Sequence, residues 1–430
     1  MRAGASWNPL APQAPPALHQ HQSPCLGLLP WAATIARVPA IVAVVTGHGR
    51  IFPPFARSRT TLGGRSFGTR AARLAAVQLL VVPELGHRAA AWDELAAAGH
   101  LPSPFLRSWW LERMPAGDPV FVLLVERSRL VGGAAFQRRR RLGLELIEML
   151  GQGPLAPDHL DLVCEPDRET SVFYAVRRWL DRPGGRLIDL QGLAEGARLV
   201  PAVPGRGAVT QMEVAPYAEL SPSFPEYLSA RPGRLRNTVA RGRRRLEREG
   251  VHHRRVGGQT GGAETSATQI DRALSALRRL HEARWKEHSS FLSCWEPFAA
   301  AVRLGARDGE VVFHELVHDD TVIATEVEFD VAGRVSFYQA GRSDDRRWRG
   351  AGTALKSHVV EWACKTGRRE FDLLRGDEPY KGDWATGRRR LWRVRRARGA
   401  ARPALAAITA REQLCSPGEL KAGSVGAAGS

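Results

Sequence analysis

The chain has 430 residues, 43% hydrophobic and 25% charged, so it is long enough to bury the cores of two globular domains. Its net charge is +18, but five of its 62 basic residues are lysine and the rest arginine, as GC-rich coding would give, and no nucleic-acid-binding module accompanies the charge. The five cysteines lie far apart without a C-x-x-C pair, which argues against a zinc knuckle or a disulfide framework and favours a reducing cytoplasm.

The N-terminal segment, residues 1–70, is dense in Pro, Gly, His and Arg and lacks sustained periodicity. We expect it to be disordered or an extended start of the chain. Residues 26–45 are apolar, but Pro30, Arg37 and Pro39 interrupt them. Because a membrane span needs ~20 consecutive apolar residues, we predict that this stretch does not cross a membrane.

A hairpin plan occurs twice in the interior. Residues 120–125 and 130–136 flank a short polar turn and predict one β-hairpin. Shifted by 192 residues, 312–317 and 322–324 predict a second, and a tryptophan-bearing helical segment precedes each hairpin. This repeat predicts two tandem α/β domains with mixed sheets, although any two α/β hairpins look alike in a single sequence.

The predicted domains occupy residues 72–215 and 216–400, followed by a flexible tail over 401–430. In the first domain, Gly151-Gln152-Gly153-Pro154 lies where a cofactor loop would be expected. Pro154 lacks a donor N–H and no helix begins at these glycines. We therefore expect the first domain to bind no cofactor and to serve as a packing partner or a wall of the substrate site.

An arginine-rich helix is predicted between the domains, over residues 232–250. Leu235, Val239 and Leu246 form one narrow apolar face, and most of the remaining surface is cationic. The arginines would suit an anionic substrate, a nucleotide phosphate or tRNA. The alternative, which we favour, is a solvated face, because charge runs on exposed helices are common.

The second domain contains the most informative pattern in the chain. A predicted strand over 336–340 leads into Arg347-x-x-Gly350-x-Gly352, and an amphipathic helix follows over 353–366. The two glycines expose backbone N–H groups where the helix N-terminus adds partial positive charge. This order predicts a cradle for a pyrophosphate.

This segment resembles the acyl-coenzyme A loop of the GNAT acyltransferase superfamily. Residues 371–381 are similar to a signature of cellulose-biosynthesis-type acyltransferases, relatives of the Fem aminoacyltransferases, and the resemblance covers residues 75–398. It implies tandem GNAT-like domains, acetyl-CoA or another acyl-CoA as co-substrate, no metal, and a small-molecule amine acceptor. The acceptor would be an amino sugar or another precursor of the cell envelope or a polysaccharide. The implied cofactor-binding residues are Arg347, Arg349, Gly350, Ala351, Gly352 and Thr353.

The same resemblance suggests how the chemistry is arranged. The strand ending at Ala340 and a strand over 370–374 would lie parallel and splay apart around the pantetheine arm, with Tyr380 as general acid for the thiolate. Pro379 and Gly382 predict a loop around this tyrosine. The predicted catalytic residues are Tyr380, Glu378 and Asp372, with Glu326, Glu328 and Asp377 as further candidate bases. The predicted substrate-binding residues are Tyr338, Arg375, Asp377 and Lys381, although Arg375 and Asp377 would also suit a structural ion pair.

Two other functions fit parts of the sequence. A Fem-like transferase using aminoacyl-tRNA would explain the basic surface and the paired domains, whereas the intact coenzyme-type loop argues against it. A non-catalytic binding protein of a polysaccharide pathway would explain the altered first domain. Apart from tRNA in the first alternative, we expect no nucleic-acid partner, and the sequence leaves the oligomeric state open.

Overall fold

The computed structural model describes residues 77–114, 117–141, 143–258, 265–285 and 289–415. The predicted disordered start and the apolar stretch at 26–45 lie outside these ranges. Within the ranges, no helix has both the length and the apolar character needed to cross a bilayer.

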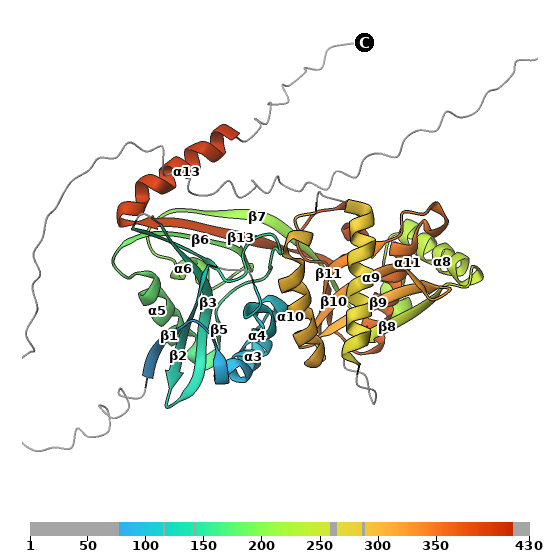
Figure 1. The fold of residues 1–430 in the computed structure, drawn as a ribbon, viewed down its shortest axis with the longest axis horizontal. Helices are drawn as coiled ribbons and strands as arrows, with labels where there is room; N and C mark the ends of the chain where they lie inside the picture. The colour runs from blue at the N-terminus through green and yellow to red at the C-terminus, as the bar shows by residue number, and fades with distance from the viewer. Residues whose placement is uncertain (1–76, 115–116, 142, 259–264, 286–288, 416–430) are drawn as a thin grey trace, which may run out of the picture. The chain divides into compact units, whose positions relative to one another are not determined.

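The described residues form one mixed sheet of thirteen strands (Figure 1). The first strands are β1 (Val77–Val82), β2 (Asp118–Glu126), β3 (Arg129–Arg141), β4 (Leu144–Met149), β5 (Val163–Cys164), β6 (Gly185–Leu193) and β7 (Arg206–Glu219). The later strands are β8 (His252–Gly257), β9 (Val311–His318), β10 (Thr321–Val331), β11 (Arg334–Arg342), β12 (Glu370–Asp372) and β13 (Gly387–Arg398). The two predicted hairpins are β2–β3 and β9–β10.

The sheet repeats one plan. In the first half, β1 to β4 are antiparallel neighbours, β4 and β6 are parallel, and β13 closes the set antiparallel to β6. In the second half, β8 to β11 are antiparallel, β11 and β12 are parallel, and β7 closes the set antiparallel to β12. Each half is therefore closed by the strand that follows the other half in sequence: β7 closes the second half and β13 closes the first. β7 and β13 also pair with each other along most of their length.

This exchange changes the predicted domain division. A boundary between residues 215 and 216 falls inside β7, which follows the first half in sequence but completes the sheet of the second half. Hydrophobic periodicity identifies a strand, but it does not identify the neighbour with which that strand pairs.

The helices connect the strands and cover the sheet. They are α3 (Ala89–Ala98), α4 (Ser108–Leu111), α5 (Glu169–Leu180), α6 (Leu199–Ala202), α7 (Phe224–Ser229), α8 (Gly233–Arg248), α9 (Ala267–Trp285), α10 (Trp295–Arg307), α11 (Ala351–Lys365), α12 (Pro379–Trp384) and α13 (Arg402–Cys415). The expected flexible tail is thus helical as far as Cys415. Helix α13 contacts β13 and β6, and Glu412 accepts a hydrogen bond of 2.9 Å from Arg395, which explains why this part is ordered.

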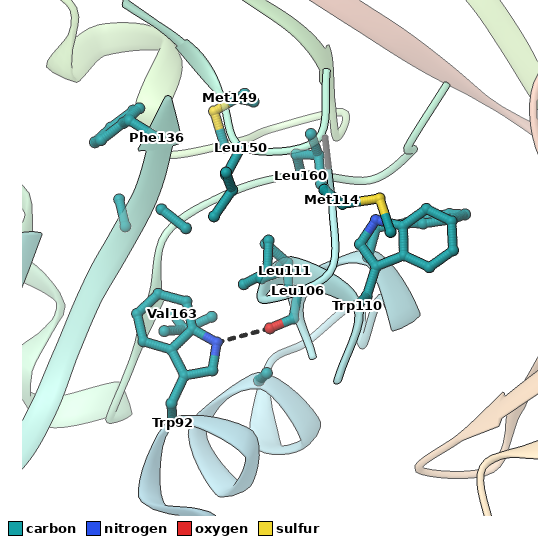
Figure 2. Close-up of a cluster of buried hydrophobic side chains, with 14 of the residues drawn as sticks. Trp92, Leu106, Trp110, Leu111, Met114, Phe136, Met149, Leu150, Leu160 and Val163 are labelled. Carbon is teal, nitrogen blue, oxygen red and sulfur yellow. Dashed lines mark hydrogen bonds between the residues drawn. The ribbon is translucent and has the colours of Figure 1, made fainter. Parts of the chain in front are cut away.

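The cores of the two halves are continuous. In the first half, Trp92 donates a hydrogen bond of 2.7 Å to the carbonyl of Leu106 within a cluster of buried apolar side chains (Figure 2). The indole of Trp109 donates to Glu310 of the second half at 2.7 Å, and Arg107 pairs with the same carboxylate. Because the apolar cluster includes Phe298 and Phe329 of the second half, the two halves share one hydrophobic interior.

Candidate active site

β11 and β12 separate after a short parallel pairing. The two strands pair only from Arg334–Glu370 to Ser336–Asp372, whereas β11 continues to Arg342. Past Asp372 the chain follows β7 instead, and the Gly376 amide donates to the Val214 carbonyl at 3.0 Å. This confirms the predicted parallel pair and its separation. We call the space between the separating strands the wedge.

Two local features shape the walls of the wedge. The register of β11 against β10 shifts between the pairs Val327–Gln339 and Glu328–Phe337, so Tyr338 is the extra residue of a β-bulge. On the other side, Leu374 has a φ of 54°, which is uncommon for a residue with a side chain. Both irregularities lie at the point where the strands part.

The glycine-rich loop ends at the N-terminus of α11. Gly350 precedes the helix in a left-handed conformation with a φ of 88°, and no side chain caps the helix. Within the described residues, no hydrogen bond occupies the amides of 350–353, and the first such bond belongs to Ala354. An α-helix leaves its first amides without internal partners, so this end is suited to an anion.

Several arginines surround this loop. Arg245 of α8 donates to the carbonyl of Arg349, directly before Gly350. The predicted cofactor residue Arg347 pairs with Glu249 at 2.9 Å and stacks on Trp348, with its guanidinium 4.4 Å from the ring centre. Arg342, at the end of β11, lies beside Gly352. Arg245 belongs to the helix whose arginines the sequence offers for a nucleotide phosphate, although a solvated face is favoured. Sequence reasoning missed Arg342, since only the fold brings the end of β11 to the loop.

Tyr380 lies on α12, and the expectation of a loop here was wrong. Pro379 occupies the first turn, where a missing N–H costs nothing, and its fixed φ favours a helix start. The tyrosine is 42% exposed. Loss of solvent around the hydroxyl and the carboxylates of Glu378 and Glu326 raise its pKa, so it stays protonated at neutral pH.

Glu378 and Lys381 lie at the start of the same short helix, α12. Glu378 precedes α12, and its carboxylate lies 3.0 Å from the Lys381 ammonium. Lys381 is buried and also donates to the Arg375 carbonyl. The lysine therefore holds the turn together, whereas the glutamate remains partly open to solvent.

Three of the predicted site residues contact the first half of the chain. Asp372 is fully buried and accepts hydrogen bonds from Arg334 at 2.5 Å and from the Leu374 amide at 3.0 Å, and His159 lies 3.1 Å away. Burial would raise the pKa of Asp372, but Arg334 and His159 hold it below its usual range. A carboxylate held in this way is poorly suited to abstract a proton.

Arg375 and Tyr338 make similar contacts. Arg375 binds Asp158 through its amide at 2.8 Å and its Nε at 2.6 Å, so its partner is not Asp377. Asp377 instead pairs with Arg388 at 2.9 Å. The hydroxyl of Tyr338 donates to the Leu155 carbonyl at 2.9 Å. Sequence spacing could not reveal partners some two hundred residues away.

Two further candidate bases form a buried cluster with Lys356. The Lys356 ammonium lies 2.9 Å from Glu326 and 3.2 Å from the ring centre of Phe337. Glu328 is fully buried, and neither of its oxygens meets a hydrogen-bond partner among the described residues. Burial and the Glu326 carboxylate raise the pKa of Glu328 well above its usual value. These carboxyl groups lie on β10, the strand that pairs with β11 at its bulge.

The matching place in the first half is filled by its own chain. β4 and β6 also part after a short parallel pairing. There the side chain of Gln152 accepts from the Gln191 amide at 2.9 Å and from the Met149 amide at 3.4 Å. The segment around Leu160 then pairs with Leu193. In the first half the separating strands are therefore bridged by Gln152 and by the segment around Leu160.

The family comparison matches the half that contains the wedge. Residues 233–382 match the family model described as an acetyltransferase (GNAT) domain. This segment of the chain is therefore similar to a GNAT domain. The match indicates an enzyme of the acyltransferase class, and GNAT domains generally use an acyl-CoA. Among the described residues, no group of three or more metal-ligating side chains is positioned to hold a metal ion.

No curated protein sequence matches the chain. Solved structures similar to it include a conserved protein of unknown function from Bacteroides thetaiotaomicron VPI-5482 (9% identity, 74% of this chain and 99% of that one, TM-score 0.48). FemX matches with 9% identity over 70% of this chain and 95% of its own, with a TM-score of 0.47. A tandem GNAT protein from the clavulanic acid biosynthesis pathway matches with 12% identity over 75% and 99%, with a TM-score of 0.40. Likenesses this distant leave donor and acceptor to be argued from the site itself.

Proposed function

We propose that the chain is an acyl-CoA-dependent N-acyltransferase that acts on a small-molecule amine. The observation that carries the proposal is the set of unused amides at residues 350–353, at the N-terminus of α11 beside the wedge. Amides at a helix N-terminus suit a diphosphate, and a gap between two strands lets a pantetheine arm pair with exposed backbone. Arg245 and Arg342 add positive charge around the same point.

The reaction needs two proton movements. The amine nitrogen bonds to the thioester carbonyl carbon, the carbon–sulfur bond breaks, the nitrogen loses a proton and the sulfur gains one. Tyr380 is suited to give a proton to the sulfur because its hydroxyl stays protonated and lies partly exposed on α12. Glu378, on the same turn, is suited to accept the proton from the amine, directly or through one water molecule.

The donor and acceptor are proposed in more specific terms. We take the donor to be acetyl-CoA and the acceptor to be an amino sugar or another precursor of the cell envelope or a polysaccharide, in the cytoplasm. In this proposal the segment 216–400 carries the reaction. The segment 72–215 binds no cofactor, which is supported by the Gln152 side chain that bridges β4 and β6.

Isothermal titration with acetyl-CoA tests the proposal. We expect binding by the wild type and its loss in Gly350→Glu, since a carboxylate there would repel the diphosphate. Gly367→Glu is the matched control, because Gly367 also has a positive φ, has open space around it and follows the other end of α11. Equal affinity in wild type and Gly350→Glu would remove the basis for the site.

A tRNA-dependent transfer is a second candidate, supported by the exposed arginines of α8. Arg234, Arg236 and Arg241 are exposed on this helix, and their partners are mostly neighbouring carbonyls. Thermal unfolding with acetyl-CoA, CoA and aminoacyl-tRNA separates the two candidates. Stabilisation by aminoacyl-tRNA alone would favour the second, whereas stabilisation by acetyl-CoA would favour the first.

A further inference from the structure

One short segment of the first half contacts both walls of the wedge. It comprises residues 155–159, which we call the clamp. At one end the Leu155 carbonyl accepts a hydrogen bond from the hydroxyl of Tyr338, the bulged residue of β11. At the other end the Asp158 carboxylate binds the amide and the Nε of Arg375, just past β12. The two sides of the opening are thus tied to the same five residues.

The clamp is itself held firmly. His159 lies 3.1 Å from Asp372, the last residue of β12, and both side chains are fully buried. Ser103 donates to the Asp158 carbonyl at 2.8 Å, and the Arg375 guanidinium donates to the Pro157 carbonyl at 2.8 Å. A hydrogen bond from a charged group is the stronger kind, so the bond from Arg375 fixes the clamp to the residues just past β12, whereas Ser103 fixes it to the first half.

The backbone of the clamp is strained. Ala156 and His159 have φ values of 46° and 56°, a region that residues with side chains rarely adopt. A β-carbon added to Gly192 would lie 2.2 Å from the Pro157 carbonyl oxygen, so the segment is also pressed closely against β6. Strained residues of this kind persist only where their surroundings fix them, and they gather at functional sites.

We propose that the clamp sets the separation of β11 and β12 and so positions the acyl-CoA, which makes Asp158 of the first half and Tyr338 of β11 positioning residues. This inference rests on the proposed function. It also assigns the first half a task in the reaction beyond packing, because the wall that carries the bulge and the wall that leads to Tyr380 are both anchored on it.

The test compares two buried aspartates. Asp158 contacts the second half, whereas Asp161 accepts from the amides of Arg198 and Leu199 within the first half. We expect Asp158→Asn and Asp161→Asn to lower the melting temperature by similar amounts. Asp158→Asn should weaken acetyl-CoA binding roughly tenfold, whereas Asp161→Asn should leave the binding unchanged. Tyr338→Phe keeps the ring packing and removes one hydrogen bond, so we expect a roughly fivefold weaker affinity with little change in stability.

Hydrogen exchange supplies the second measurement. Faster amide exchange in β11 and in residues 373–378 of Asp158→Asn, without the same change in Asp161→Asn, would support the clamp. If both Asp158→Asn and Tyr338→Phe bind acetyl-CoA as the wild type does, the clamp inference is wrong while the proposed function stands. If the wild type itself binds no acetyl-CoA, the proposed function fails first.

Discussion

Tyr380 is the side chain on which the proposed chemistry depends most directly. Replacing it with phenylalanine removes only the hydroxyl, so we expect kcat to fall roughly 100-fold, within the usual contribution of a general acid, while acetyl-CoA binding stays the same. Because its pKa is raised, activity should persist into alkaline solution before the hydroxyl ionises. Thiol release measured over a pH range tests this. Tyr174→Phe, at an exposed position of the first half, is the control, and an unchanged kcat in Tyr380→Phe would exclude the assigned role.

Glu328 makes stability depend on pH in an unusual direction. Its pKa is raised in the folded state, so its contribution to stability is fully present below the unfolded value and is lost as the pH rises through the folded value. Glu328→Gln mimics the protonated form. We expect the variant to match the wild type near pH 4.5 and to be more stable at pH 8, by roughly 1–3 kcal/mol, the usual cost of a buried polar group without a partner.

Urea unfolding at the two pH values measures this difference. The control is Glu219→Gln, which removes an exposed carboxylate from β7. Asp330 would not serve as a control position, because its carboxylate pairs with Arg368. A stability gain in Glu328→Gln that is the same at both pH values would show that packing, and not ionisation, is responsible.

Residue types alone predicted the glycine-rich loop before α11 but not the partners of charged residues. Gly350 and Gly352 were recognisable because their spacing reflects backbone chemistry that is local in sequence. Asp372, Arg375 and Lys381 were equally conspicuous, yet each makes structural bonds that depend on residues remote in the chain or on the turn it stabilises. Burial decides whether a carboxylate acts as a base, and a single sequence does not show burial.

At the scale of elements, we expect a negative charge at the N-terminus of α11 to raise the stability of the protein and to abolish acetyl-CoA binding. Gly352 has a helical φ and lies in the first turn, so Gly352→Glu introduces a carboxylate near free amides without backbone strain. We expect a slightly higher melting temperature, from about 0.3–1 kcal/mol of helix-dipole interaction. We expect acetyl-CoA binding to be lost.

Calorimetry and isothermal titration measure the two effects separately. Gly352→Gln has similar size without the charge and should bind acetyl-CoA better than Gly352→Glu. Wild-type affinity in both variants would mean that the anion does not approach this turn. The outcome would also separate charge repulsion from simple obstruction, because the glutamine keeps the bulk.

At the scale of the whole molecule, the exchanged strands couple the stability of the two halves. β13 lies between β6 and β7, so deleting residues 387–415 exposes an edge of each. We expect amides of β6 to exchange much faster in this variant, although β6 is far from the deletion in sequence. Deleting 402–415 alone is the control and should have a smaller effect. Unchanged protection of β6 would contradict the coupling.

The repeat of the fold was visible in the sequence, whereas the exchange was not. Two hairpins 192 residues apart predicted the paired plan, and β2–β3 and β9–β10 confirm them. The pairing of β13 with β6 depends on a register between strands some two hundred residues apart, which no local pattern encodes. The helix at Pro379 escapes prediction for the opposite reason, since a proline predicts a loop in many contexts but also favours the first turn of a helix.

The order of the strands along the chain also constrains biosynthesis. A ribosome makes the first half long before β13, so the second edge of β6 is covered only after β13, the last strand among the described residues, has been made. Until then a nascent chain presents an unpaired strand edge, which is where unwanted association begins. Products truncated before Gly387 would keep this edge unpaired and would be natural clients of chaperones and proteases.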